Sequence, residues 1–166
     1  MINLILAADE NNCIWNSTNN KLCWNLKKDL KFFSEKTTWN VVIMGRNTYF
    51  SLPEKFRPLP NRINFVVSKT LKWENIKIFP TLIDAINEAK KLKKEIFLIW
   101  WKQIYEEWID FAKKVYLTRI FEKFDCDVCL SKDFFLKLEK DFKLVQKSDI
   151  YEENGLKFAF YEYERI

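Results

Sequence analysis

The amino-acid sequence predicts an α/β fold, with helices packed on a mostly parallel central sheet and an antiparallel hairpin at the C-terminus. Short β-branched apolar runs alternate with amphipathic helical patterns, as in parallel strands joined by helical crossovers. Near the end, two apolar runs flank Glu153-Asn154-Gly155, a signal for a hairpin. No linker, internal repeat or low-complexity segment interrupts the 166 residues, so we expect a single domain, residues 1–166.

The first elements are a strand, a loop and a helix. Residues 2–8 are a short apolar run that predicts a buried strand, and residues 9–21 are polar and rich in asparagine, which predicts a loop. Residues 22–33 predict a loop that continues into an amphipathic helix.

Asp29 is the unusual residue of this helix, because its spacing puts it on the apolar face with Leu26, Phe32 and Phe33. A carboxylate at such a place must be paired or have a raised pKa. Both conditions suit a group that binds a cationic or amidine-like partner and manages a proton. The alternative is an acid of the first helical turn that interacts only with the helix dipole.

The middle of the chain contains two cationic candidates. Residues 40–44 predict a strand, and Gly45-Arg46-Asn47-Thr48 predicts a strand-to-helix junction. The N–H groups of such a junction and the Arg46 guanidinium are suited to holding a phosphate, although Arg46 also fits an ordinary surface position. Residues 56–62 form a proline-stiffened connection that ends at Arg62, before a strand over 63–68.

The same alternation continues to the C-terminus. Residues 76–79 and 95–99 predict strands on either side of a helix over 81–92, whose apolar residues recur at helical spacing. After Trp100-Trp101, a helix is expected through Phe111. The strands expected after it cover residues 115–121, 142–145 and 156–164, the last two forming the hairpin at the sheet edge.

Composition limits the possible functions. The chain has 28 basic and 23 acidic residues, a net charge of +5, and its lysines are dispersed, so a nucleic-acid partner is not indicated. The N-terminal residues lack the pattern of a signal peptide and no window approaches a membrane span. We therefore expect a cytoplasmic protein with no membrane partner.

The histidine and cysteine content limits the chemistry. Histidine is absent, which excludes Ser-His-Asp and Cys-His nucleophiles and leaves acid–base chemistry to a carboxylate, tyrosine, lysine or water. Cys126 and Cys129 have C-x2-C spacing, which admits a zinc or redox site, but Cys13 and Cys23 lie far away in sequence. We expect reduced thiols and no metal.

Six segments, in order over nearly the full length, together resemble the dihydrofolate reductase family. They are Trp24-Asn25-Leu26 with Asp29 and Phe33, residues 42–48, residues 57–62, Val67-Ser68, Ile99 with Tyr105, and residues 116–120. The resemblance implies a three-layer fold with helices on both faces of the sheet. It also implies hydride transfer from NADPH to 7,8-dihydrofolate, giving 5,6,7,8-tetrahydrofolate for one-carbon metabolism, by a monomer with a small-molecule substrate.

The resemblance also implies four catalytic residues. Asp29 would accept hydrogen bonds from the pterin 2-amino group and N3 and favour N5 protonation by water, and Thr118 would support it through its hydroxyl. Trp24 would position a water, and Leu22 would lie in a mobile loop over the nicotinamide. Arg62 would pair with the substrate α-carboxylate. The implied substrate pocket comprises Ile5, Ala7, Asp29, Phe33, Leu52, Leu59, Arg62, Ile99, Tyr105 and Thr118, where core packing is the alternative for the apolar members.

For the cofactor, the resemblance places Arg46, Thr48, Ser68 and Lys69 at the phosphates. Gln103 stands where the family often has a further arginine, which weakens the expected preference for NADPH. The full set implied for NADPH is Ala7, Ile14, Trp15, Gly45, Arg46, Asn47, Thr48, Ser68, Lys69, Ile99, Trp100, Trp101, Lys102, Gln103 and Ile104.

Glycine positions depart from the family pattern. The chain has 2 glycines and 7 tryptophans, where average usage predicts roughly a dozen glycines. Trp100 and Trp101 replace adjacent family glycines, and Trp15 and Trp39 replace a loop and a turn glycine. Either the chain is a non-catalytic module that has lost its cofactor, or the source cell reads UGA as glycine and the sequence was translated with tryptophan. A riboflavin-pathway pyrimidine reductase is the enzymatic alternative.

Overall fold

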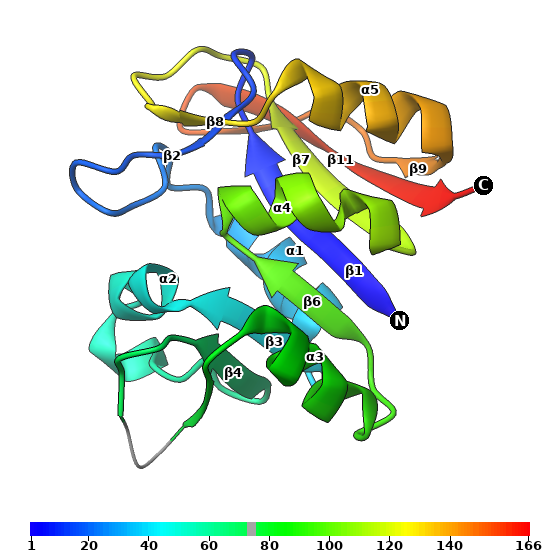
Figure 1. Cartoon of the computed structure of the whole chain (residues 1–166). Coiled ribbons are helices and arrows are strands. Elements are labelled where there is room, and N and C mark those ends of the chain that lie inside the picture. Colours follow the sequence, from blue (N-terminus) through cyan, green and yellow to red (C-terminus); the bar gives the residue numbers. More distant parts are fainter. Residues whose placement is uncertain (73–75) are drawn as a thin grey trace.

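A computed structural model describes residues 1–72 and 76–166 of the chain (Figure 1). Within these residues, nine strands form one central sheet. They are β1 (Ile2–Ala8), β3 (Val41–Gly45), β4 (Ile63–Val67), β5 (Lys77–Phe79), β6 (Ile96–Ile99), β7 (Lys114–Ile120), β9 (Phe142–Lys147), β10 (Tyr151–Glu153) and β11 (Leu156–Arg165). Every strand expected from the sequence is present, with ends that agree to within two residues.

The strand order is β10-β11-β7-β1-β6-β3-β4-β5, and β9 pairs with the outer side of β11. All pairings from β7 to β5 are parallel, whereas β11 runs antiparallel to β7, β9 and β10. The prediction of a mostly parallel sheet with an antiparallel C-terminal hairpin is therefore confirmed. β1 lies at the centre, and its register places Ala7 beside Thr118 of β7 and Ile5 beside Ile99 of β6.

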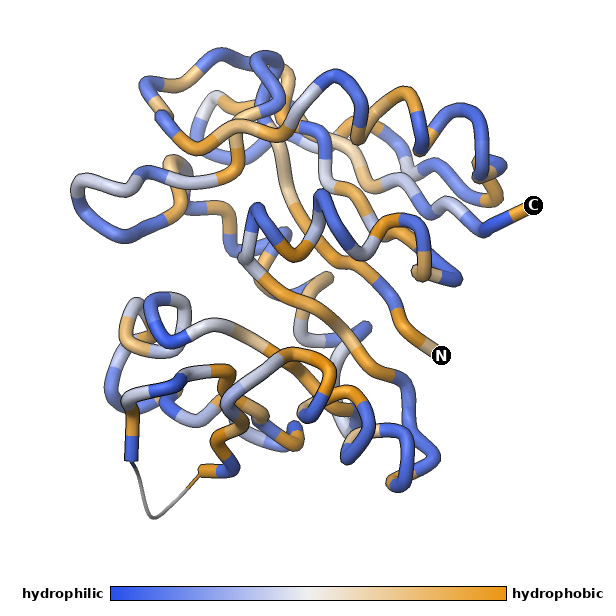
Figure 2. Tube along the Cα trace, in the orientation of Figure 1, coloured by the Kyte–Doolittle hydropathy of each residue, from blue (hydrophilic) through white to orange (hydrophobic). Residues whose placement is uncertain are grey.

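Helices cover both faces of the sheet, giving three layers. They are α1 (Lys27–Thr37), α2 (Arg46–Ser51), α3 (Leu82–Lys90), α4 (Lys102–Trp108) and α5 (Lys132–Asp141), with 3-10 turns η1 (Glu54–Phe56) and η2 (Ile109–Phe111). Figure 1 shows α3, α4 and α5 in front of the sheet and α1 behind it. The tube coloured by hydropathy is orange along β1 and β6, while the helices alternate between orange and blue (Figure 2). This is the pattern of a buried parallel sheet between amphipathic helices.

Alternate side chains of β1 supply the two cores. Leu4 and Leu6 pack with α3, α4 and α5, whereas Ile5 packs with Phe33 of α1 on the opposite face. The alternation follows from the pleat, which sends successive side chains to opposite faces of a strand. The face shared with α1 is the one on which the candidate site lies.

Four features of the fold differ from the sequence prediction or were not part of it. The turn over residues 153–155 joins β11 to β10, a strand that was not predicted, and not to β9. The expected loop over residues 9–21 contains a short strand, β2 (Cys13–Trp15), which pairs with β8 (Val128–Cys129). Helix α5 was not anticipated, although Ser131 caps it by accepting a hydrogen bond from Phe134 N–H at 3.2 Å. Phe32 does not share the surroundings of Asp29, because its ring stacks on Phe160 of β11 with centroids 4.2 Å apart.

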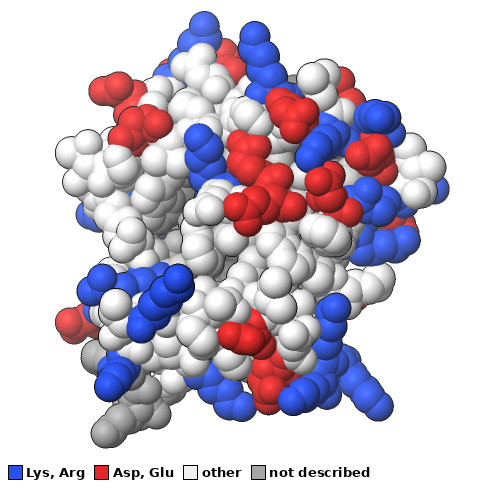
Figure 3. Space-filling model, in the orientation of Figure 1, with Lys and Arg blue, Asp and Glu red and all other residues white. Residues whose placement is uncertain are grey.

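Charge is dispersed over the surface in the view of Figure 3, where basic and acidic side chains are intermixed. None of the helices among the described residues has the length and apolar character needed to cross a membrane.

Candidate active site

Two adjoining cavities open at the carboxyl ends of the parallel strands, and Trp15 and Trp100 line both. The first has a volume of about 510 Å³ and lies between α1, the end of α2 and the loop over residues 21–26. The second has a volume of about 540 Å³ and lies between the start of α2, the end of β4 and the start of α4. Together they form a continuous cleft at the carboxyl ends of β3, β4 and β6, where open α/β sheets generally bind ligands.

Asp29 lines the first cavity from α1. The Thr118 hydroxyl on β7 donates a 2.7 Å hydrogen bond to Asp29 Oδ1. Burial raises the pKa of Asp29 from 3.8 to about 6, the hydrogen bond from Thr118 opposes this rise, and the negative charge of Glu153 adds to it. The carboxyl group is therefore poised to exchange a proton near neutral pH, as the position on an apolar helix face suggested.

Glu153 holds the start of the helix that carries Asp29. Leu26 occupies the N-cap of α1 and has no side-chain oxygen to cap it. The Glu153 carboxylate on β10 does so instead, accepting hydrogen bonds from the N–H groups of Lys27 at 2.7 Å and Lys28 at 3.0 Å. The capping role of Glu153 was not predicted from the sequence. Capping residues are recognised next to a helix, and Glu153 is 126 residues from Lys27.

Trp24 and Leu22 border the first cavity. Trp24 is buried beside Ala7 and Leu26, with its ring tilted against Phe124 at a centroid distance of 5.5 Å. Within the described residues, no hydrogen-bond acceptor faces the buried indole Nε1 of Trp24. A buried N–H of this kind normally has a partner, so this donor suits a water or a ligand atom in the cavity.

Five of the six apolar residues predicted for the substrate pocket form one buried cluster, and among them Leu52 is the one that lines the first cavity. One cluster contains Ile5, Phe33, Leu52, Leu59 and Ile99, and the indole of Trp100 packs against it. The Trp100 ring stacks on Phe33 with centroids 4.8 Å apart. An indole thus occupies the boundary between the two cavities.

Two polar candidates of the substrate pocket have partners within the chain. The Arg62 guanidinium lies 5.7 Å from the Phe33 ring centroid and donates to the Thr37 hydroxyl at 3.2 Å. Partial burial lowers the pKa of Arg62. Tyr105 is fully buried, donates to the Ile5 carbonyl at 2.7 Å and accepts from Trp100 N–H, so it supports the backbone rather than opening to the cleft.

Most residues predicted for the cofactor line the second cavity. They are Ile14, Trp15, Gly45, Arg46, Asn47, Thr48, Ser68, Trp100, Trp101, Lys102 and Gln103. Four predicted residues are not among its lining. Ile104 is a core residue, Ile99 belongs to the apolar cluster, Ala7 packs with Trp24, and Lys69 is exposed beyond β4. Ser17, Asn20, Val67 and Val128, which the sequence did not indicate, complete the lining.

The second cavity matches NADPH in charge but not in shape. Arg46, Lys102 and the Ser68 hydroxyl suit the phosphates of a dinucleotide. However, the Trp101 indole lies over Gly45, with ring atoms 3.4 Å from the place a Cβ would take there. Gly45 precedes α2, where N–H groups are free to bind an anion, so the indole covers backbone that a diphosphate needs to approach. With Trp15, Trp100 and Trp101 lining it, the second cavity does not fit the cofactor.

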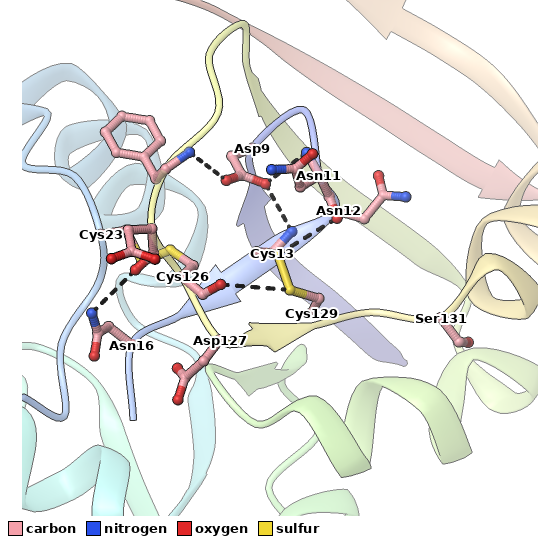
Figure 4. Close-up of a disulfide and its surroundings, with 12 residues drawn as sticks. Asp9, Asn11, Asn12, Cys13, Asn16, Cys23, Cys126, Asp127, Cys129 and Ser131 are labelled. Carbon is pink, nitrogen blue, oxygen red and sulfur yellow. Dashed lines mark hydrogen bonds between the residues drawn. A yellow bond between two sulfur atoms is a disulfide. The ribbon is translucent and has the colours of Figure 1, made fainter. Parts of the chain in front are cut away.

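The loops at the outer end of the cleft are tied by two disulfides, Cys13–Cys129 and Cys23–Cys126 (Figure 4). The expectation of four reduced thiols is therefore wrong for this structure, because the fold brings cysteines more than 100 residues apart in sequence side by side. Fully buried Asp9 anchors the same loops, since its carboxylate accepts from the N–H groups of Asn11, Cys13 and Phe124. Cys23 precedes Trp24, so this network fixes one wall of the first cavity.

Comparison with known proteins places the cleft in context. The sequence profile described as "Dihydrofolate reductase" matches residues 1–165. The chain is 34% identical to a dihydrofolate reductase of Drosophila melanogaster over 178 residues, covering 95% of this chain and 94% of that protein. It is 39% identical over 144 residues to a bifunctional dihydrofolate reductase-thymidylate synthase of Paramecium tetraurelia, covering 85% of this chain but 30% of that protein. A solved dihydrofolate reductase from Enterococcus faecalis, complexed with NADP(H) and RAB-propyl, superposes with a TM-score of 0.84 and 27% identity, covering 99% of this chain and 96% of that one.

Proposed function

The chain belongs to the dihydrofolate reductase family, and we infer from this membership that its cleft reduces 7,8-dihydrofolate to 5,6,7,8-tetrahydrofolate. NADPH is the hydride donor of this family's reaction. The observation that carries the assignment to this cleft is the pair formed by Asp29 and Thr118, a carboxyl group with a raised pKa at the wall of a cavity large enough for a pterin.

Asp29 binds and orients the pterin in this proposal. A carboxylate presents two acceptor oxygens in a plane, which match the two donors of a 2-amino-pyrimidine edge as they match a guanidinium. The Thr118 hydroxyl donates to one acceptor site of Oδ1, which fixes the carboxyl plane and leaves the second site of Oδ1 and both sites of Oδ2 for the ligand. Because the pKa of Asp29 is about 6, both protonation states are accessible at working pH.

Water delivers the proton to pterin N5. Among the described residues that line the first cavity, Asp29 is the single carboxyl group, and its bonds to the pyrimidine edge occupy it. The buried Nε1 of Trp24 at the same cavity has no partner among the described residues and is placed to hold a water. Asp29 favours this step by stabilising positive charge on the pterin ring.

Arg62 binds the carboxylate of the substrate's glutamate tail. Its guanidinium lies over Phe33 at the end of the apolar cluster, beyond Asp29 along α1. One N–H faces the Thr37 hydroxyl, and a guanidinium has further donors for a planar carboxylate. We further propose that the enzyme works as a monomer.

Two alternative functions, a non-catalytic binding module and a pyrimidine reductase, can be distinguished from dihydrofolate reduction by one assay. A non-catalytic binding module is favoured by one observation, the indoles of Trp100 and Trp101 in the cleft. A pyrimidine reductase of the riboflavin pathway would act on a pyrimidine and not on a pteridine. The test is NADPH oxidation followed spectroscopically with dihydrofolate and, separately, with the pyrimidine, using the chain with glycine at 15, 39, 100 and 101. Turnover with dihydrofolate that Asp29→Asn abolishes supports the reductase. Binding of folate without turnover would establish the module instead.

A further inference from the structure

The backbone at two tryptophans has the conformation that glycine adopts. We propose that the native protein carries glycine at positions 39 and 100, and by the same codon at 15 and 101, because its source cell reads UGA as glycine. The proposal accounts for the misfit between the chain and NADPH. It rests on backbone geometry and composition, and it stands or falls separately from the proposed activity.

Trp39 occupies the position of a tight turn that requires a positive φ. Thr38 has φ −55° and ψ 135°, Trp39 has φ 68°, and Asn40 N–H donates to the Thr37 carbonyl at 3.0 Å. These values describe a type II turn, whose third residue is glycine or asparagine because a Cβ is strained there. The Trp39 side chain is 68% exposed and in no core cluster, so no packing compensates for the strain.

Trp100 has φ 47° at the junction of β6 and α4. Its backbone is held on both sides, because its N–H donates to the Tyr105 hydroxyl and its carbonyl accepts from the Thr48 hydroxyl at 2.9 Å. These two hydrogen bonds fix the backbone conformation at residue 100 and involve no atom of the indole. A left-handed conformation fixed in this way is typical of glycine and a genuine outlier for a bulky residue.

The other residues with positive φ are mostly asparagines, so bulky side chains do not commonly adopt this conformation in the described part of the chain. Besides the two tryptophans, the described non-glycine residues with positive φ are Asn12, Asn20, Asn61, Asn154 and Lys93. Asparagine is the non-glycine residue that best tolerates this conformation. Two of the six described tryptophans thus fall where glycine belongs. The chain has only 2 glycines in all, against roughly a dozen expected.

Trp15 and Trp101 have ordinary φ values but obstruct the same cleft. The Trp101 indole lies on Gly45, and Trp15 lines both cavities. Trp24 and Trp108 differ from the other four described tryptophans in that neither lines the second cavity and neither has a positive φ. One reassigned codon accounts for the described tryptophans that have a positive φ or line the second cavity, which are Trp15, Trp39, Trp100 and Trp101.

Mass spectrometry of the protein isolated from its source cell tests the proposal directly. Trypsin releases residues 37–46, which contain position 39, and residues 95–102, which contain positions 100 and 101. We expect glycine masses at all three. The peptides over 22–27 and 103–113 should keep tryptophan at 24 and 108 and serve as controls. Tryptophan at 39 or at 100 overturns the proposal.

Thermal unfolding of recombinant variants tests the backbone argument independently. Trp39→Gly and Trp39→Asn should raise the unfolding midpoint by about 2 to 4 °C, whereas Trp39→Ala, which keeps a strained Cβ, should not. Trp108→Gly is the matched control and should lower the midpoint, because it removes packing and puts glycine in a helix. A lower midpoint for Trp39→Gly contradicts the argument.

Equilibrium titration with NADPH tests the effect on the cleft without relying on turnover. Trp100→Gly with Trp101→Gly should tighten NADPH binding about tenfold or more, and Trp108→Phe should leave it unchanged. If the parent and the double variant bind NADPH with equal affinity, the two indoles do not block the cofactor site. If native protein carries glycine and binds NADPH but does not reduce dihydrofolate, the recoding stands and the proposed activity fails.

Discussion

Thr118 on β7 and Asp29 on α1 are joined by a 2.7 Å hydrogen bond from the threonine hydroxyl to Oδ1. The bond links the central sheet to helix α1, and Asp29 lines the first cavity. Burial raises the pKa of the carboxyl group and this bond lowers it, so the resulting value of about 6 is a balance between the two. Changes at either residue, or at Glu153 nearby, therefore alter both stability and chemistry.

Asp29→Asn should slow dihydrofolate reduction by about 100-fold or more at pH 7 while leaving NADPH affinity unchanged. The amide cannot stabilise a protonated pterin, and it faces the pterin with an N–H donor. The loss should shrink at low pH, where more of the substrate is protonated before it binds. Steady-state kinetics between pH 5 and 8, in the chain with glycine at 15, 39, 100 and 101, measure this. Turnover equal to that of the parent at pH 7 would remove Asp29 from the mechanism.

The same substitution should stabilise the protein at high pH. The pKa of Asp29 is about 6 in the folded state against 3.8 ordinarily, so ionised Asp29 opposes folding by up to about 3 kcal/mol above pH 6. This cost decreases as the pH falls through 6 and is largely gone near pH 4. Urea unfolding should therefore show Asp29→Asn to be more stable at pH 8 and nearly equal at pH 4. Glu35→Gln, at an exposed acid of α1, is the control and should change the free energy of unfolding by less than about 0.5 kcal/mol.

Glu153→Gln should lower the pKa of Asp29. The glutamine oxygen still accepts from the start of α1, but the negative charge that raises the Asp29 pKa is gone. The acidic limb of the pH profile of kcat/KM should move to lower pH, and NMR titration of the Asp29 carboxyl carbon should show the same shift. Glu152→Gln, at the exposed acid next in the chain, should leave both unchanged. A profile that does not move would limit Glu153 to a capping role.

Arg62→Leu should raise KM for dihydrofolate by about 10-fold or more with little change in kcat. An ion pair in a partly open cleft contributes roughly 1 to 3 kcal/mol to binding and none to the chemical step. A pterin that lacks the glutamate tail serves as the comparison, and its KM should hardly change. Equal increases for both substrates would indicate that Arg62 supports the structure through Thr37 and Pro60 instead.

Protein purified in air should contain no free thiol, because each of the four cysteines is paired. Alkylation of the unfolded chain without a reductant should leave the intact mass unchanged, and alkylation after reduction should label four sites. Labelling of all four without reduction would show that the thiols are free, as expected for a reducing compartment.

Local pattern in the sequence was enough to predict most of the fold and part of the site. Strand and helix positions follow from hydrophobic periodicity over a few residues, which is a property of each segment alone. Asp29 was recognisable because a charge on an apolar helix face is conspicuous without knowing what packs on it. Arg46 and Thr48 were recognisable because a strand-to-helix junction is a local feature, and the structure places both at the second cavity.

Only the tertiary structure decided which distant groups meet. Glu153 reaches the start of α1, Cys13 meets Cys129, and Phe32 turns to Phe160, since each pairing depends on the order of strands in the sheet. The composition showed that glycine is scarce, but the φ angles identified Trp39 and Trp100 as residues in glycine conformations. Backbone angles at a turn or junction are imposed by the elements on either side, so a residue that contradicts them becomes visible only after the chain has folded.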